Sequence, residues 1–175
     1  MEYLDVLDEQ GNPTGKKKLR DDVHREGDWH ACVQLWLVNS KSQILLQKRS
    51  KNVKTWPGRW AFTVGGHVLA GEKLEDALVR EMFEELGLEM SKTEFKFAFK
   101  NKNPSQTTNN NQWDSIYVAL KDVDVDKLEL DPEEVEAMTW VELGDFKKAI
   151  LSDDDKFVPR SADYLSRLFI AINNI

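Results

Sequence analysis

Residues 66–88 are GHVLAGEKLEDALVREMFEELGL, and this stretch decides how the chain folds. Its apolar residues recur at helical spacing between about Lys73 and Leu86, after a break at Gly65-Gly66. Gly87 stands where a helix commonly ends. On a wheel of roughly 100° per residue, one apolar stripe contains Leu74, Ala77, Leu78 and Met82. The stretch therefore predicts an amphipathic helix with glycines on both sides.

Three glutamates crowd the C-terminal half of this helix. Glu81 and Glu85 fall within the apolar stripe, and Glu84 lies at its edge. Clustered glutamates usually mark a solvated face, but carboxylates that point with core residues cost desolvation energy unless a cation compensates them. The helix dipole also disfavours negative charge at this end. We therefore expect a hard cation such as Mg²⁺, which can polarise a phosphoryl group and activate water for diphosphate chemistry.

The spacing within this stretch resembles the Nudix box. Gly66 is followed by five residues, Glu72, seven residues and then REMFEELGL from Arg80 to Leu88. With seven fixed positions at about 7% frequency each, chance gives on the order of 10⁻⁸ per start point, so coincidence is negligible. The chain is identified as a member of the Nudix family. The resemblance implies an α/β (α+β) fold with a mixed sheet sandwiched between helices and the box as a loop, helix and loop.

The family pattern assigns a role to each box residue. Glu81, Glu84 and Glu85 would bind Mg²⁺, for which Mn²⁺ can substitute, together with the carbonyl of Gly65. Arg80 joins these glutamates in the catalytic set and braces the box with Glu72, and the remaining structural positions are Gly66 and Gly87. The general base would come from the box, as Glu81, or from outside it, for which the candidates are Glu133, Glu134 and Glu136.

Outside the box the likeness rests on weaker features, which are the strand ending at Leu46–Arg49, the turn at Trp56–Trp60, and Trp140-Val141. Lys48 and Arg49 are candidate contacts for substrate phosphates, with a surface role on an edge strand as an equal alternative. The tryptophans are expected in the core more than as platforms for stacking a base.

Residues 1–90 resemble the family branch that contains isopentenyl-diphosphate isomerase. In that branch a cysteine precedes a Gly-His pair, whereas this chain has Gly65 there and its single cysteine, Cys32, on another predicted strand. Isomerase chemistry would therefore lack its acid/base residue. The three histidines, His24, His30 and His67, fall near isomerase metal ligands. Because matching acidic partners are not visible around residues 112–114, satisfied structural histidines are favoured over a second metal site.

The expected function is Mg²⁺-dependent hydrolysis of a diphosphate linkage in a nucleoside diphosphate derivative or a similar small organic diphosphate. Isopentenyl-diphosphate isomerase remains an alternative, and so does a Nudix module that binds without cleaving, although the complete box argues against the latter. Residues 101–112 and the segment around 157–164 would select the substrate, which the sequence does not identify.

Composition sets wider limits. A chain of 175 residues with 41% hydrophobic and 31% charged residues predicts one domain over 1–175. The absence of a long apolar window or a secretory leader predicts no membrane span, and the single cysteine fits the reducing cytoplasm. A net charge of −7 argues against binding a nucleic-acid polymer. The sequence leaves open whether the chain forms a homodimer.

Residue patterns predict the other elements. Lys16–Arg20 is expected to be a solvated basic patch, and 101–112 a mobile loop. Strands are expected at Tyr3–Leu7, Ala31–Val38, Gln43–Lys48, Ala61–Val64, Glu94–Phe99, Ser115–Leu120 and Met138–Val141. Further helices are expected at Asp145–Leu151 and Ser161–Asn173.

Overall fold

The computed structural model describes residues 1–105, 109–152 and 154–175. Its centre is a mixed sheet of seven strands in the order β5-β4-β3-β8-β7, with β6 paired to β3 and β9 paired to β4. Strands β3 and β8 run parallel, and the other pairs are antiparallel. The strands are β3 (His30–Val38), β4 (Gln43–Arg49), β5 (Trp60–Ala61), β6 (Val64–His67), β7 (Phe95–Asn103), β8 (Gln112–Leu120) and β9 (Val135–Glu142).

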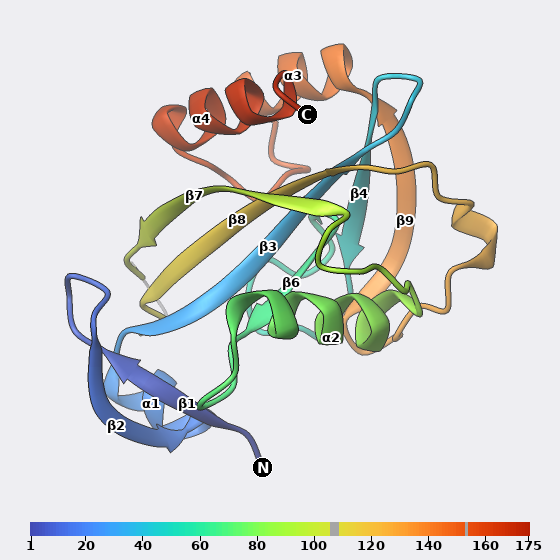
Figure 1. The fold of residues 1–175 in the computed structure, drawn as a ribbon. Helices are drawn as coiled ribbons and strands as arrows, with labels where there is room; N and C mark the ends of the chain where they lie inside the picture. Colours follow the sequence, from blue (N-terminus) through green and yellow to red (C-terminus); the bar gives the residue numbers. More distant parts are fainter. Residues whose placement is uncertain (106–108, 153) are drawn as a thin grey trace.

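Helices cover the two faces of this sheet. Helix α2 (Leu74–Leu86) lies on one side, and α3 (Leu143–Leu151) and α4 (Ala162–Ile172) lie on the other (Figure 1). Side chains alternate along β3, so Val33 and Leu35 pack in the core under α2, while Trp36 and Val38 pack in the core under α3 and α4. This arrangement confirms the predicted mixed sheet between helices.

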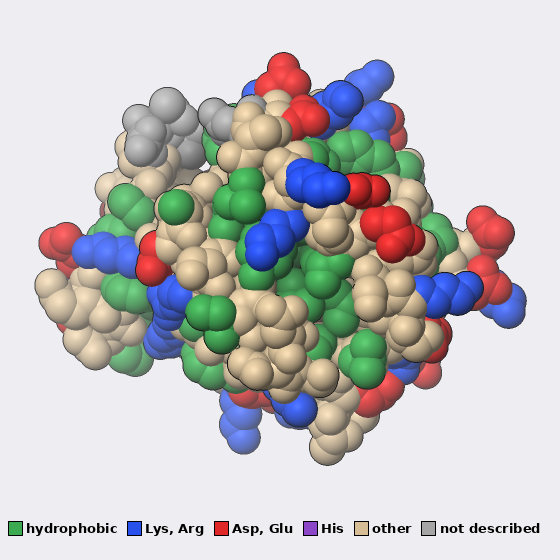
Figure 2. Space-filling model, turned by 90° about the horizontal axis from the view of Figure 1, so that it is seen from above, with side chains coloured by type: hydrophobic (Ala, Val, Ile, Leu, Met, Phe, Trp, Pro, Cys, Tyr) green, Lys and Arg blue, Asp and Glu red, His purple; other side chains and the backbone are tan. Residues whose placement is uncertain are grey.

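The outer face that carries α3 and α4 shows hydrophobic side chains between scattered charged ones (Figure 2). Leu151 and Ile170 are among its exposed apolar residues. No helix in the described part of the chain is long and apolar enough to cross a membrane.

The N-terminal region differs from the prediction. Strand β1 (Tyr3–Leu7) was expected, but β2 (Pro13–Leu19) and α1 (Arg20–Glu26) were not. The lysines of the expected solvated patch lie in β2, where backbone pairing with β1 holds a segment that has no apolar alternation. The small core here consists of Leu4, Val6 and Val23, with Leu69 packed against it.

Residues 101–112 also depart from the expected loop. The first three residues belong to the end of β7, and Gln112 begins β8, because Asn103 pairs with Gln112 in the ladder between these strands. The middle of that segment, 106–108, lies outside the described residues. After β8 a short 3₁₀ turn, η1 (Val125–Lys127), leads into β9.

Candidate active site

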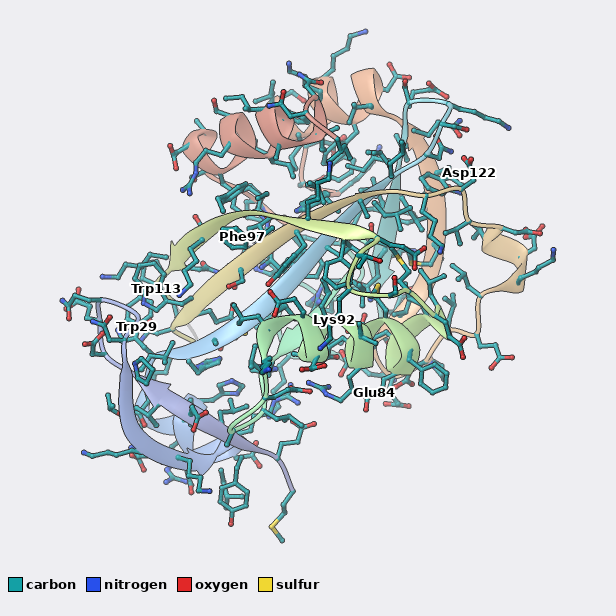
Figure 3. All side chains as sticks on the ribbon, viewed as in Figure 1. Trp29, Glu84, Lys92, Phe97, Trp113 and Asp122 are labelled. Carbon is teal, nitrogen blue, oxygen red and sulfur yellow. The ribbon has the colours of Figure 1, made fainter. Side chains whose placement is uncertain are left out.

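Helix α2 places the three glutamates in different environments. Glu85 belongs to its buried face beside Leu78 and Met82, and the Glu81 side chain is 13% exposed. The Glu84 side chain is 56% exposed at the lower edge of α2 in Figure 3. Two carboxylates therefore point inward, as the wheel predicts, and one points toward solvent.

Adjacent glycines of β6 make room for this arrangement. A Cβ on Gly66 would overlap the carboxylate of Glu81, so any side chain there would displace it. A Cβ on Gly65 would lie 2.5 Å from the backbone oxygen of Val33 and 2.8 Å from the ring of Phe62. Because the Val33 contact is with backbone, a cysteine at position 65 would require β3 and β6 to shift.

Arg80 joins the box into one network. Its guanidinium donates from Nε and Nη2 to the two oxygens of Glu72, both at 3.0 Å. Nη1 donates to Glu81 at 2.8 Å and to Glu84 at 2.9 Å, and Nη2 also donates to the backbone oxygen of His67 at 2.8 Å. The loop and the helix of the box are thereby fixed to each other by one side chain.

Burial makes the inner carboxylates poor anions. Burial raises the pKa of Glu81, and the neighbouring Arg80 offsets only part of this increase. Burial and the neighbouring Glu81 raise the pKa of Glu85 well above its ordinary value, although Gln47 donates to Glu85 Oε2 at 2.7 Å. Two neighbouring carboxylates whose pKa values are raised by burial are a donor set suited to a hard divalent cation, because the cation would favour their charged forms.

The two basic residues at the end of β4 have separate environments. Lys48 forms an ion pair with Glu136 at 2.6 Å across the β4–β9 pair. Arg49 is half-buried, donates from Nε to the backbone oxygen of Thr55 at 2.9 Å, and lies close enough to Glu85 to lower the pKa of that carboxyl. Of the two predicted phosphate contacts, Arg49 lies near Glu85 of the box, whereas Lys48 is paired with Glu136.

The acidic segment before β9 offers one carboxylate near the box. Glu133 accepts a hydrogen bond from Asn52 at 3.3 Å, and Glu136 is paired with Lys48. Glu134 is half-buried and raises the pKa of Glu85, so it lies near that carboxylate. Of the three predicted outside bases, Glu134 is the one whose charge acts on Glu85.

The three histidines converge beside the box, at α1, the start of β3 and the end of β6. One ring nitrogen from each lies within 4.8 Å of the other two, and Nε2 of His24 and Nε2 of His67 are 3.2 Å apart. His30 is fully buried and donates from Nδ1 to the backbone oxygen of Asp28 at 3.2 Å, while its Nε2 has no hydrogen-bond partner among the described residues. The expectation of satisfied histidines is therefore wrong for His30.

Burial also keeps these rings neutral. It lowers the pKa of His24, lowers that of His30 to about 4, and lowers that of His67 well below its ordinary range. Neutral imidazoles whose nitrogens converge can ligate zinc or manganese.

Sequence reasoning missed one buried carboxylate. Asp114 on β8 pairs in register with Cys32 on β3, which in turn pairs with His67. It is fully buried, burial raises its pKa, and its Oδ1 has no hydrogen-bond partner in the part of the chain that the structure describes. Residues 114–119 of β8 are all buried, so no alternation of polar and apolar residues marks Asp114, and its partners on the neighbouring strands are not visible in a local pattern.

Comparison with known proteins places this geometry in a family. The profile of the NUDIX domain matches residues 28–161, and the chain therefore belongs to the Nudix family. This finding confirms the family that the spacing of residues 66–88 predicts. Homologues in the family include hydrolases, and the family typically depends on divalent metals.

Relatives at about 30% identity include a hydrolase and an isomerase. Nudix hydrolase 3 of Arabidopsis thaliana is 33% identical over 165 residues, which cover 90% of this chain and only 21% of that protein. Isopentenyl-diphosphate Delta-isomerase of Escherichia coli is 30% identical over 161 residues, which cover 90% of this chain and 86% of the isomerase. Both similarities extend far beyond the box.

Solved structures share the fold. DR0079 from Deinococcus radiodurans superposes with a TM-score of 0.72 at 22% identity and covers 95% of this chain and 98% of its own. The NUDIX domain of Shewanella oneidensis NrtR, complexed with ADP ribose, has a TM-score of 0.60 at 18% identity. The match covers 82% of this chain and 86% of the NrtR chain. These likenesses confirm the predicted α/β Nudix fold.

Proposed function

We propose that the chain hydrolyses a diphosphate linkage in a nucleoside diphosphate derivative or a similar small organic diphosphate. Mg²⁺ or Mn²⁺ would be held by Glu81, Glu84, Glu85 and the carbonyl of Gly65. The observation that carries the proposal is the burial of Glu81 and Glu85 side by side, with raised pKa values that a cation would reverse. The bound cation would polarise phosphoryl oxygens and lower the pKa of a water molecule.

The chain's own residues would supply the remaining functions. Arg80 holds Glu81 and Glu84 in fixed directions through its hydrogen bonds. Glu134, near Glu85 and without an ion-pair partner among the described residues, would accept the proton of the attacking water. Arg49 would bind a substrate phosphate, which pairs well with the planar guanidinium fork.

Two observations favour hydrolysis over isomerisation. Glycine at position 65 has no group that can donate a proton, and the space for a side chain there is occupied by the Val33 oxygen and the Phe62 ring. Isopentenyl diphosphate in Mg²⁺ and deuterated water should therefore give no dimethylallyl diphosphate and no deuterium exchange. Detectable allylic product would instead support the isomerase alternative.

A release screen tests the proposal. Nucleotides, sugar nucleotides, dinucleotides and isoprenoid diphosphates would be incubated with the protein in Mg²⁺ and, separately, in EDTA. At least one compound should release phosphate or a phosphorylated product in Mg²⁺ only. Release that persists in EDTA would contradict the cation mechanism, and binding without cleavage of any compound would favour the non-catalytic alternative.

We also propose that the histidine cluster holds a second, softer cation. The unpartnered, fully buried Nε2 of His30 is the observation that favours it. Zn²⁺ should raise the melting temperature of the wild type by binding the native state, and His30→Gln should abolish this increase. An equal increase in both proteins would contradict a site built on His30.

A further inference from the structure

The arginines of the chain fall into two groups. Four form ion pairs with carboxylates, and these are Arg20, Arg25, Arg80 and Arg167. Three have no carboxylate at ion-pair distance among the described residues, and these are Arg49, Arg59 and Arg160. The three guanidinium groups without an ionic partner in the described structure are therefore the ones whose charge is open to an anionic ligand.

The three unpaired arginines belong to one corner of the fold. The backbone N–H of Arg49, at the end of β4, donates to the backbone oxygen of Arg59 at 2.9 Å. The guanidinium of Arg59 donates to the backbone oxygen of Phe157 at 3.1 Å. Trp60 and Val158 are joined by a backbone hydrogen bond of 2.9 Å, so the segment that ends in Arg160 runs beside β5. Residues 98 positions apart in the sequence are thereby brought together.

Aromatic packing fixes the direction of Arg160. Its guanidinium lies over the ring of Phe62, 5.3 Å from the centroid, and over the ring of Tyr164 at 4.9 Å. Tyr164 is itself held in the core, since its hydroxyl accepts from Trp36 and donates to Gln34, both at 2.8 Å. Stacking engages the flat face of the guanidinium and leaves the N–H groups on its edge available to an acceptor.

This corner adjoins the box. The Phe62 ring that supports Arg160 lies against Gly65 on one face of β6, and the Glu81 carboxylate lies against Gly66 on the opposite face of the same strand. Burial lowers the pKa of the Arg49 guanidinium, Glu85 partly offsets that decrease, and the nearby charge of Arg160 adds to it. Glu134 likewise acts on Arg49, and the charge of Arg160 acts on the buried Asp114, but among the described residues no carboxylate is at ion-pair distance from either guanidinium. A phosphate between the two arginines would be the anion that contacts both directly.

We propose that Arg49 and Arg160 form an anion subsite that binds a phosphate group of the substrate beside the cation site, with Arg59 positioning the segment that carries Arg160. The inference rests on the proposed function, and it adds the C-terminal segment to the substrate site. Two planar forks can each make paired hydrogen bonds to phosphate oxygens, which a single lysine cannot reproduce. The substrate class is then one whose phosphate groups extend from the box glutamates toward β5.

The test measures binding without chemistry. Methylenediphosphonate has no P–O–P linkage to hydrolyse, and its affinity for the full chain in Mg²⁺ would be measured by titration calorimetry. Arg160→Gln should weaken binding at least about 10-fold, because a charge-assisted hydrogen-bond pair contributes roughly that factor. Arg160→Lys, which keeps the charge and loses the fork, should fall between Arg160→Gln and the wild type.

Arg167→Gln is the matched control. Arg167 also lies over an aromatic ring, that of Phe99 at 4.3 Å, but it is paired with Asp163 and belongs to α4. Its substitution should leave the affinity unchanged, and thermal melts would verify that every variant is folded. Wild-type affinity in Arg160→Gln, an equal loss in Arg167→Gln, or no binding by the wild type would each overturn the subsite.

Failure of the subsite is distinguishable from failure of the proposed function. A chain that binds methylenediphosphonate through Arg160 but cleaves none of the screened compounds would contradict the hydrolase proposal and retain the subsite. A Mg²⁺-dependent hydrolase whose methylenediphosphonate affinity is unaffected by Arg160→Gln would contradict only the subsite.

Discussion

The glutamate box and the histidine cluster are neighbours that differ in how far their buried polar groups are hydrogen-bonded within the protein. Arg80 bonds to Glu72, Glu81 and Glu84, so much of the box is internally paired. In the cluster, His30 is buried and its Nε2 has no hydrogen-bond partner among the described residues. His67 belongs to both, because its backbone oxygen accepts from Arg80 while its ring faces His24. Arg80 therefore orients Glu81 and Glu84, which would also hold the cation, whereas Nε2 of His30 is left to a ligand alone.

The largest effect is expected where a box carboxylate is least paired. Glu85 has one side-chain hydrogen bond in the described structure, from Gln47, and therefore keeps an oxygen for a cation. Glu85→Gln should reduce turnover by about 1,000-fold or more in steady-state assays of the Mg²⁺-dependent reaction, because it removes a ligand charge and keeps the shape. The exposed Glu89→Gln is the matched control and should remain fully active. Near-normal turnover in Glu85→Gln would refute the metal assignment.

The next effect concerns stability. Arg80→Gln should lower the free energy of unfolding by about 3 kcal/mol in urea titrations, because it leaves the partly buried carboxylates of Glu72 and Glu81 without their cation. Arg25→Gln provides the comparison, since Arg25 pairs with Asp22 and Glu26 at the surface and should cost less than about 1 kcal/mol. Equal costs would mean that the Arg80 network does not hold the box together.

The histidine cluster should be visible in the pH dependence of stability. The pKa of His30 is about 4 in the folded chain, below its ordinary value of 6.5, so the unfolded chain binds more protons between these values. The contribution of neutral His30 is complete above pH 6.5 and is lost as the pH falls toward 4. Metal-free wild type in EDTA should therefore lose about 3 kcal/mol more than His30→Gln over this window.

The test compares the pH dependence of the free energy of unfolding in the wild type with that in His30→Gln, because other groups also titrate in this range. Glu81 and Glu85 have raised pKa values and give the opposite slope, since their protonated forms are favoured in the folded chain. Parallel urea titrations from pH 7.5 to 4 would measure both proteins. Identical slopes would show that His30 is protonated as easily in the folded chain as in the unfolded one.

The same contrast explains which parts of the molecule the sequence predicts. Residues 66–88 contain the whole helix and its glutamates within one short stretch, so local spacing predicts both the stripe and the direction of Glu81 and Glu85. The histidine cluster and the Arg160 corner assemble from elements far apart in the chain, and no local pattern contains them. Strand β2 was missed for a related reason, because its lysines are held by pairing with β1 and not by burial.

The smallest expected effect separates two sequence neighbours that were both predicted to bind phosphate. Lys48 is paired with Glu136, and the two side chains are 31% and 35% exposed, so Lys48→Gln should cost at most about 1 kcal/mol of stability and change kcat/KM by less than about 2-fold. Arg49 has no ionic partner among the described residues, and Arg49→Gln should reduce kcat/KM by about 10-fold through the loss of a charge-assisted contact. Steady-state kinetics on one active compound would compare the two variants. An equal loss of kcat/KM in both variants would mean that Lys48 leaves Glu136 to bind the substrate. An ion pair in the free protein would then not show that a charged residue has a purely structural role.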